Sequence, residues 1–176
     1  MNLYVGCTQG IGKTTLAKKN DMFVDLDGAI SLYRTIILDK KKEFVENLLN
    51  IDNKIILFNV KPKFFIKKRS DFMFNDEIKH IETAKNYFFL NVENIAEDLK
   101  ARIKKRELAI NSFNGLKKEE INHFFKKIDF YTIEYIKFIN NLNTKNKITI
   151  NSIDELNNLE NILLSKFEEL KNAENG

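Results

Sequence analysis

Short apolar runs alternate with longer segments of amphipathic spacing along the whole chain. Five of these runs are mostly apolar and bounded by polar residues or glycine, which predicts β-strands. They begin near Asn2, Met22, Lys54, Tyr87 and Lys147. The run from Lys54 to Val60 is apolar at most positions, which is typical of a strand buried on both faces inside a parallel sheet.

Helices are predicted between the strands, where apolar residues recur at helical spacing. The first begins near Lys13, the second covers residues 29 to 50, and a long helix runs from Glu119 to Asn141. In the helix after the fourth strand, Asn94 takes the N-cap position and Glu97 is placed to reach back to it.

The last predicted helix starts at the capping box Ser152-Ile153-Asp154-Glu155. Its apolar positions fall on one face: Leu156, Leu159, Leu163, Phe167 and Leu170. Strands that alternate with helices indicate an α/β fold, here a three-layer sandwich with a five-stranded parallel sheet. No repeat and no long linker divides residues 1–176, so we expect a single domain.

The composition is that of a soluble globular protein, with 43% hydrophobic and 31% charged residues. The longest apolar stretches are only a few residues, so no membrane span is expected. No basic segment precedes an apolar run at the N-terminus, so no signal peptide is expected. The single cysteine, Cys7, has no partner for a disulfide within the chain and fits a reducing cytoplasm.

The net charge of +4 and the pI near 9.0 raise the question of a nucleic-acid partner. The lysines are interspersed with glutamates and asparagines, as on a solvated surface, so this partner stays open but is not favoured. Arginine supplies only four of the 29 basic residues: Arg34, Arg69, Arg102 and Arg106. Lysine would serve wherever surface charge alone is needed, so the arginines are candidates for specific contacts. Arg34 and Arg69 are candidates for an acceptor pocket.

A glycine-rich segment follows the first predicted strand and precedes a helix. The P-loop pattern G-x-x-x-x-G-K-[ST] fits from Gly12 onward, with Cys7 where the first glycine belongs. In such a loop glycines let backbone N–H groups converge on phosphates, the lysine reaches the β- and γ-phosphates, and the hydroxyl of Thr14 holds Mg²⁺. The residues predicted to bind a nucleoside triphosphate are Thr8, Gln9, Gly10, Ile11, Gly12, Lys13, Thr14 and Thr15.

Two carboxylates lie at the end of the second predicted strand, Asp25 and Asp27. The third strand ends in asparagine, so Asn59 is expected at most to bind a water of the Mg²⁺ shell. Asp25 is therefore the candidate acid near the metal, together with Thr14, and both aspartates are candidates for binding the acceptor. The alternative for Asp27 is that it caps the following helix.

Two arginines lie four residues apart on the helix after the fourth strand, so Arg102 and Arg106 project from one face. From there they could lean over the triphosphate and stabilise charge on the transferred phosphoryl group. The alternative is a solvated basic face, because Lys104 and Lys105 are adjacent.

The glycine-rich segment, the acidic strand end and the helix with two arginines, in this order, resemble the small P-loop kinases. The chain is most similar to short phage-type nucleoside and nucleoside monophosphate kinases, with shikimate and gluconate kinases nearby. The resemblance implies ATP with Mg²⁺ as donor, a nucleotide or nucleoside as the small-molecule acceptor, and a lid between about Lys105 and Lys118. The catalytic residues that it implies are Lys13, Asp25, Arg102 and Arg106.

Two other functions stay open. One is a polynucleotide kinase that acts on DNA or RNA through the lysine-rich surface. The other is a non-catalytic P-loop module that only binds nucleotide, which Cys7, the short first helix and Asn59 would favour. His80 and His123 are isolated in the sequence and lack metal-ligand spacing, so they are interpreted as structural.

Overall fold

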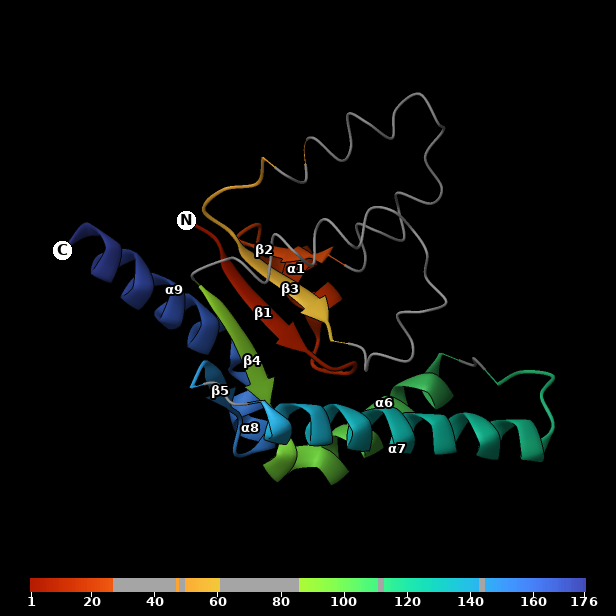
Figure 1. The fold of residues 1–176 in the computed structure, drawn as a ribbon. Coiled ribbons are helices and arrows are strands. Elements are labelled where there is room, and N and C mark those ends of the chain that lie inside the picture. The colour runs from red at the N-terminus through yellow and green to blue at the C-terminus, as the bar shows by residue number, and fades with distance from the viewer. Residues whose placement is uncertain (27–46, 48–49, 61–85, 111–112, 143–144) are drawn as a thin grey trace.

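The computed structural model of the chain describes residues 1–26, 47, 50–60, 86–110, 113–142 and 145–176. Its centre is a five-stranded, all-parallel sheet in the order β2-β3-β1-β4-β5 (Figure 1). The strands are β1 (Leu3–Cys7), β2 (Phe23–Asp25), β3 (Ile55–Asn59), β4 (Tyr87–Asn91) and β5 (Lys147–Thr149). The predicted α/β class and the five parallel strands are confirmed.

The first strand lies at the middle of this sheet, and its five residues are all buried. It pairs with β3 from Leu3↔Ile55 to Cys7↔Asn59 and with β4 from Tyr4 to Gly6. A strand that carries no charged side chain can be buried at small cost when its backbone groups are hydrogen-bonded on both edges.

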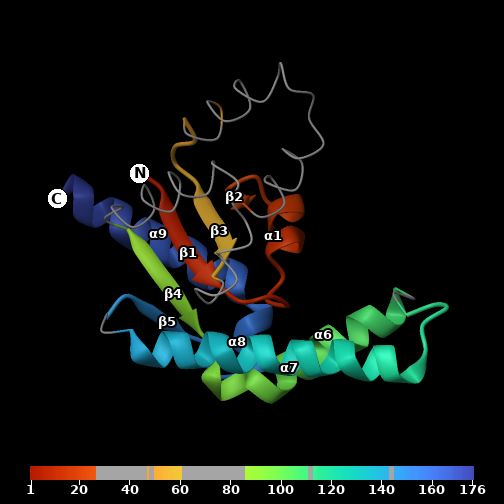
Figure 2. The same ribbon diagram turned by 45° about the vertical axis from the view of Figure 1, so that its right-hand side comes forward.

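The described helices are α1 (Lys13–Lys19), the 3₁₀ turn η1 (Glu93–Ile95), α6 (Ala96–Ala109), α7 (Lys118–Asn141), α8 (Ile153–Asn157) and α9 (Leu159–Asn175). The strands β1 and β4 point with their carboxyl ends toward the α6–α7 pair, as both views show (Figures 1 and 2). The helix predicted over residues 29 to 50 falls almost entirely outside the described residues.

Helices lie on both sides of β4. Phe138 of α7 packs edge-on against Phe89, with ring centroids 5.9 Å apart, and Lys166 of α9 lies 5.1 Å from the ring of Phe88. Consecutive residues of a strand face opposite sides of the sheet, so α7 and α9 cover opposite faces there.

A polar contact joins the first turn of α9 to the end of α1. Glu160 accepts hydrogen bonds from the ammonium of Lys19 at 2.5 Å and from the amide of Asn20 at 3.0 Å. These two donors hold the pKa of Glu160 below its ordinary value. The contact is exposed, so its role is to orient α1 and not to stabilise the fold strongly.

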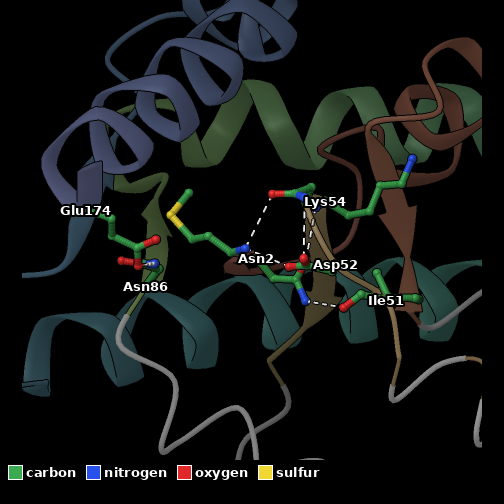
Figure 3. A network of polar contacts seen from close by, with 8 residues as sticks. Asn2, Ile51, Asp52, Lys54, Asn86 and Glu174 are labelled. Atoms are coloured by element: carbon green, nitrogen blue, oxygen red, sulfur yellow. Dashed lines mark hydrogen bonds and ion pairs between the residues drawn. The ribbon is translucent and has the colours of Figure 1, made fainter.

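A polar network joins segments at the amino ends of the strands (Figure 3). The side chain of Asn2 donates to the carbonyl oxygen of Ile51 at 2.6 Å and accepts from the backbone N–H of Lys54 at 3.0 Å. The amide of Asn86 donates to Glu174 at 3.3 Å, which links the start of β4 to α9. The network lies at the end of β1 opposite the glycine-rich segment.

The prediction that Asn94 caps the helix after the fourth strand is wrong. A 3₁₀ turn from Glu93 to Ile95 precedes α6, which begins at Ala96. The side chain of Asn94 instead donates to Asn151 at 2.9 Å, and the N–H of Glu93 is satisfied by Asn91. Because Asn94 is the middle residue of this turn, the residue before α6 is Ile95, which has no side-chain oxygen to cap the helix.

The predicted last helix is divided. Ser152 does cap its first turn, accepting from the N–H of Glu155 at 3.1 Å, but α8 ends at Asn157 and α9 begins at Leu159. Glu155 reaches back to the N–H of Asn151, one residue before the position that the capping box implies. The apolar face survives the break, because four of its five predicted residues are buried: Leu156, Leu159, Leu163 and Phe167.

A buried tyrosine of α7 joins the two strands beside it. The hydroxyl of Tyr135 donates to the carbonyl oxygens of Leu90 at 2.6 Å and Gly6 at 3.2 Å. The β1–β4 pairing ends at Gly6 and Phe89, so the hydroxyl lies where the ladder stops. Burial raises the pKa of Tyr135 well above its ordinary value.

We predict that Tyr135→Phe lowers the free energy of unfolding by about 1–3 kcal/mol, because it leaves buried carbonyl oxygens without their donor. The folded state retains the phenol proton at pH values where the unfolded chain loses it, so wild-type stability should decline as the pH rises above about 10. The variant should decline less steeply. Urea denaturation between pH 7 and 11 measures both effects, and equal slopes in the two proteins would contradict the assignment.

Candidate functional site

The glycine-rich loop, residues Thr8 to Gly12, leaves β1 at the carboxyl edge of the sheet and enters α1. Cys7 is the last residue of β1 and is fully buried, and its thiol donates to the carbonyl oxygen of Phe58 at 3.4 Å. Among the described residues, the non-glycine with positive φ is Asn53, so Cys7 keeps ordinary strand backbone. Its position in the P-loop pattern therefore needs no glycine in this chain.

Glycine is required further along the loop, where the backbone turns. Gly10 and Gly12 have φ of +84° and +97°, values that residues with a Cβ rarely adopt. Between them Ile11 is only 2% exposed and anchors the loop in the core. Thr8 is also buried, whereas Gln9 is half-buried.

Lys13 is held inside the loop by two neutral oxygens. Its ammonium donates to the side-chain oxygen of Asn59 at 2.5 Å and to the backbone carbonyl of Thr8 at 3.3 Å, and the residue is 8% exposed. From the sequence, Asn59 is expected at most to bind a water of the Mg²⁺ shell. In the structure its amide oxygen accepts a hydrogen bond from Lys13. Neutral partners satisfy the ammonium without cancelling its charge.

Thr14 and Asp25 come together at the mouth of the loop. The hydroxyl of Thr14 donates to a carboxylate oxygen of Asp25 at 2.7 Å, and Asp25 is the last residue of β2. The described residues contain no group of three or more His, Cys, Asp or Glu side chains that could hold a metal ion. One carboxylate beside one hydroxyl does fit Mg²⁺, which keeps several waters and takes further ligands from phosphate oxygens. Thr15, the next residue of α1, is exposed.

The helix α6 lies directly against the glycine-rich loop. A Cβ at Gly10 would come within 2.5 Å of Ile103 and 3.3 Å of Leu99, and a Cβ at Gly12 would lie 4.0 Å from the guanidinium of Arg102. Arg102 also donates to the side-chain oxygen of Asn157 at 3.4 Å. The loop is thus bounded by α6 and by the end of α8.

The two arginines predicted to act together have different surroundings. Arg102 lies beside Gly12, whereas Arg106 is one turn further along α6 and forms an ion pair with its neighbour Glu107 at 2.8 Å. The side chain of Arg106 is 55% exposed. Arg102 therefore lies next to the loop, whereas the contact that the structure gives Arg106 is its ion pair with Glu107.

Lys104 does not belong to a merely solvated basic face. It forms an ion pair with Asp129 of α7 at 2.8 Å and lies 5.5 Å from the centre of the Phe125 ring. The ion pair of Lys104 joins α6 to α7. The neighbouring Lys105 is exposed and fits the description of a solvated basic residue.

The segment expected to form a lid, from about Lys105 to Lys118, is partly helical. Its first residues are the last turn of α6, which ends at Ala109, and Lys118 opens α7. Between them Phe113 packs edge-on against Phe124 and Phe125, at centroid distances of 5.2 and 5.4 Å. Three further predicted site residues, Asp27, Arg34 and Arg69, lie outside the described residues.

Sequence reasoning missed two contacts of the site. The hydrogen bond from Lys13 to Asn59 could have been predicted, because the sequence places an asparagine at the carboxyl end of the strand next to β1. The hydrogen bond from Arg102 to Asn157 could not, because the two residues are 55 positions apart in the chain.

The chain matches no protein-family model, no curated protein and no solved structure. In the described part of the chain, no helix combines the length and apolar character needed to cross a membrane.

We predict that Gly10→Ala destabilises the fold more than Gly115→Ala. Both glycines have positive φ, which costs alanine about 1–2 kcal/mol. At Gly10 the new methyl group would also overlap Ile103, whereas at Gly115 nothing lies within 4 Å. Overpacking adds about 1–3 kcal/mol. Chemical denaturation of the two variants measures the difference, and equal losses would show that α6 yields freely at the loop.

Proposed function

We propose that this protein is an ATP-dependent phosphotransferase with a P-loop kinase-like fold, which transfers the γ-phosphoryl group to a small acceptor, a nucleotide or nucleoside. In this proposal residues 1–176 form one domain in the cytoplasm, and the tip of the α6–α7 pair, about residues 105–118, is its lid. ATP is the donor and Mg²⁺ the metal.

The observation that carries the proposal is the placement of Lys13. A nearly buried ammonium lies under a loop with two positive-φ glycines, at the carboxyl edge of a parallel sheet, and its two protein partners are neutral. Ligands of open α/β sheets bind at this edge. A cation kept charged and partly shielded from water is suited to binding a polyanion such as a triphosphate.

The neighbouring groups supply the other parts of phosphoryl transfer. Thr14 and Asp25 would hold Mg²⁺ through the hydroxyl and a carboxylate oxygen, and Asp25 would also orient the acceptor. An acceptor oxygen would form a bond to the γ-phosphorus while the bond from that phosphorus to the β–γ bridging oxygen breaks and ADP leaves. Where the acceptor is a hydroxyl, its proton would pass to the carboxylate of Asp25. Arg102 lies close enough to the loop to stabilise charge on the transferred group.

A panel of acceptors, read by ADP release in the presence of Mg·ATP, tests the proposal. Nucleosides, nucleoside monophosphates, shikimate, gluconate and DNA or RNA with free 5′ ends belong in the panel. Turnover with a small acceptor supports the proposal. Turnover only with nucleic acid, weakening steeply with salt, would instead show a polynucleotide kinase. ATP binding without turnover on any acceptor would show a nucleotide-binding module.

Lys13→Ala should remove most triphosphate binding while leaving the sheet intact, because the ammonium contacts polar oxygens and not the core. Wild-type protein at an ATP concentration 100 times its dissociation constant should gain about 2.7 kcal/mol in unfolding free energy, and the variant far less. Thermal melts with and without Mg·ATP measure the gain. Equal shifts in the two proteins would remove Lys13 from the site.

Arg102→Lys should lower kcat by about tenfold or more with little change in ATP affinity, because lysine keeps the charge but lacks the planar fork that binds phosphate oxygens. Arg106→Lys is the matched control on the same helix face, and its side chain is already paired with Glu107. We expect it to retain most activity. If Arg106→Lys proved the more damaging change, the assignment of the two arginines would be reversed.

A further inference from the structure

Asn59 lies at the end of β3 beside the glycine-rich loop. A carboxylate in its place would contact the ammonium of Lys13. Asn59 is the last residue of β3, and its register partner is Cys7, the residue from which the loop departs. The N–H of Val60 donates to the carbonyl oxygen of Cys7 at 2.9 Å, so the backbone at this point is fixed on both sides of Asn59. The side chain is half-buried and reaches the Lys13 ammonium.

The amide differs from a carboxylate of the same shape in its charge and in its NH₂ group, which donates hydrogen bonds that a carboxylate cannot. Aspartate at this distance would form an ion pair with Lys13 inside a partly buried site, where charge interactions are poorly screened. The lysine would then be largely neutralised before any anion arrived. A second carboxylate near Asp25 would also repel the phosphate oxygens. With the amide, Lys13 is oriented by two hydrogen bonds and keeps its charge.

We propose that Asn59 is a positioning residue that holds the Lys13 ammonium ready in the loop while leaving its positive charge available to a polyphosphate. This inference rests on the proposed triphosphate site. In this proposal Asn59, at the end of β3, orients Lys13, while Thr14 and Asp25 bind the metal.

The decisive variant is Asn59→Asp, which changes charge with almost no change in shape. Inorganic tripolyphosphate, without and with Mg²⁺, is the probe, and calorimetry gives its dissociation constant. We expect Asn59→Asp to weaken binding by at least about tenfold in both conditions, as charge pairs in close contact commonly do. Asn59→Ala, which keeps the lysine charge, should change affinity by no more than about threefold.

A matched control introduces the same charge at the end of the neighbouring strand. Asn91 ends β4, and its side-chain oxygen already accepts the N–H of Glu93, a contact that aspartate would preserve. Asn91→Asp should leave tripolyphosphate binding within about twofold of wild type, because it does not contact Lys13. A loss equal to that of Asn59→Asp would show that general charge, and not the lysine contact, is responsible.

A second readout needs no ligand at all. Melting temperatures are measured for Asn59→Asp in the wild-type background and in Lys13→Met. If residue 59 contacts the lysine, the aspartate should be better tolerated with Lys13 present than without it, and the difference is the coupling between the two sites. A coupling of zero would overturn the positioning role.

The outcomes separate the inference from the function on which it rests. Asn59→Asp binding that is unchanged without Mg²⁺ but tighter with it would place residue 59 on the metal and overturn the inference alone. Wild-type protein that binds no tripolyphosphate would overturn the proposed triphosphate site and with it the purpose assigned to Asn59. The melting-temperature cycle would then still show whether Asn59 holds Lys13.

Discussion

The pairing of β1 with a strand on each of its edges is the constraint on which the rest of the structure depends. Because β3 and β4 satisfy its backbone on both sides, β1 can be apolar and wholly buried. Gly6 is part of this constraint, since a Cβ there would come within 2.7 Å of Val60 and 2.9 Å of Phe89. The glycine-rich loop thus follows the central strand of the sheet, which is paired on both edges and buried along its whole length.

Neutral hydrogen-bond partners set the electrostatics of the candidate site. Lys13 contacts an amide oxygen and a backbone carbonyl, while the carboxylate of Asp25 bonds to the neighbouring hydroxyl of Thr14. Under the proposed function, this ammonium would face phosphate oxygens and this carboxylate would face Mg²⁺.

The helix α6 makes the loop part of a larger unit. Ile103 packs at Gly10, Arg102 lies at Gly12, and Lys104 binds Asp129 on α7. Through Tyr135, α7 is in turn bonded to the carbonyl of Gly6 at the end of β1. These contacts connect β1, the loop, α6 and α7 in a closed circuit, so a shift of α6 would move the backbone of the glycine-rich loop.

The five parallel strands, the short helix at Lys13 and the long helix α7 could be predicted from the amino-acid sequence, because hydrophobic periodicity shows which faces of an element must be buried. The local pattern also indicated that Lys13 and Thr14 begin a helix and that Asp25 ends a strand. The side chains that these groups contact came from the packing of distant elements. Asn94 donates to Asn151, Asn59 accepts from Lys13, and Arg102 donates to Asn157. The partners of these polar side chains lie on other elements, and no local pattern encodes a distance across the fold.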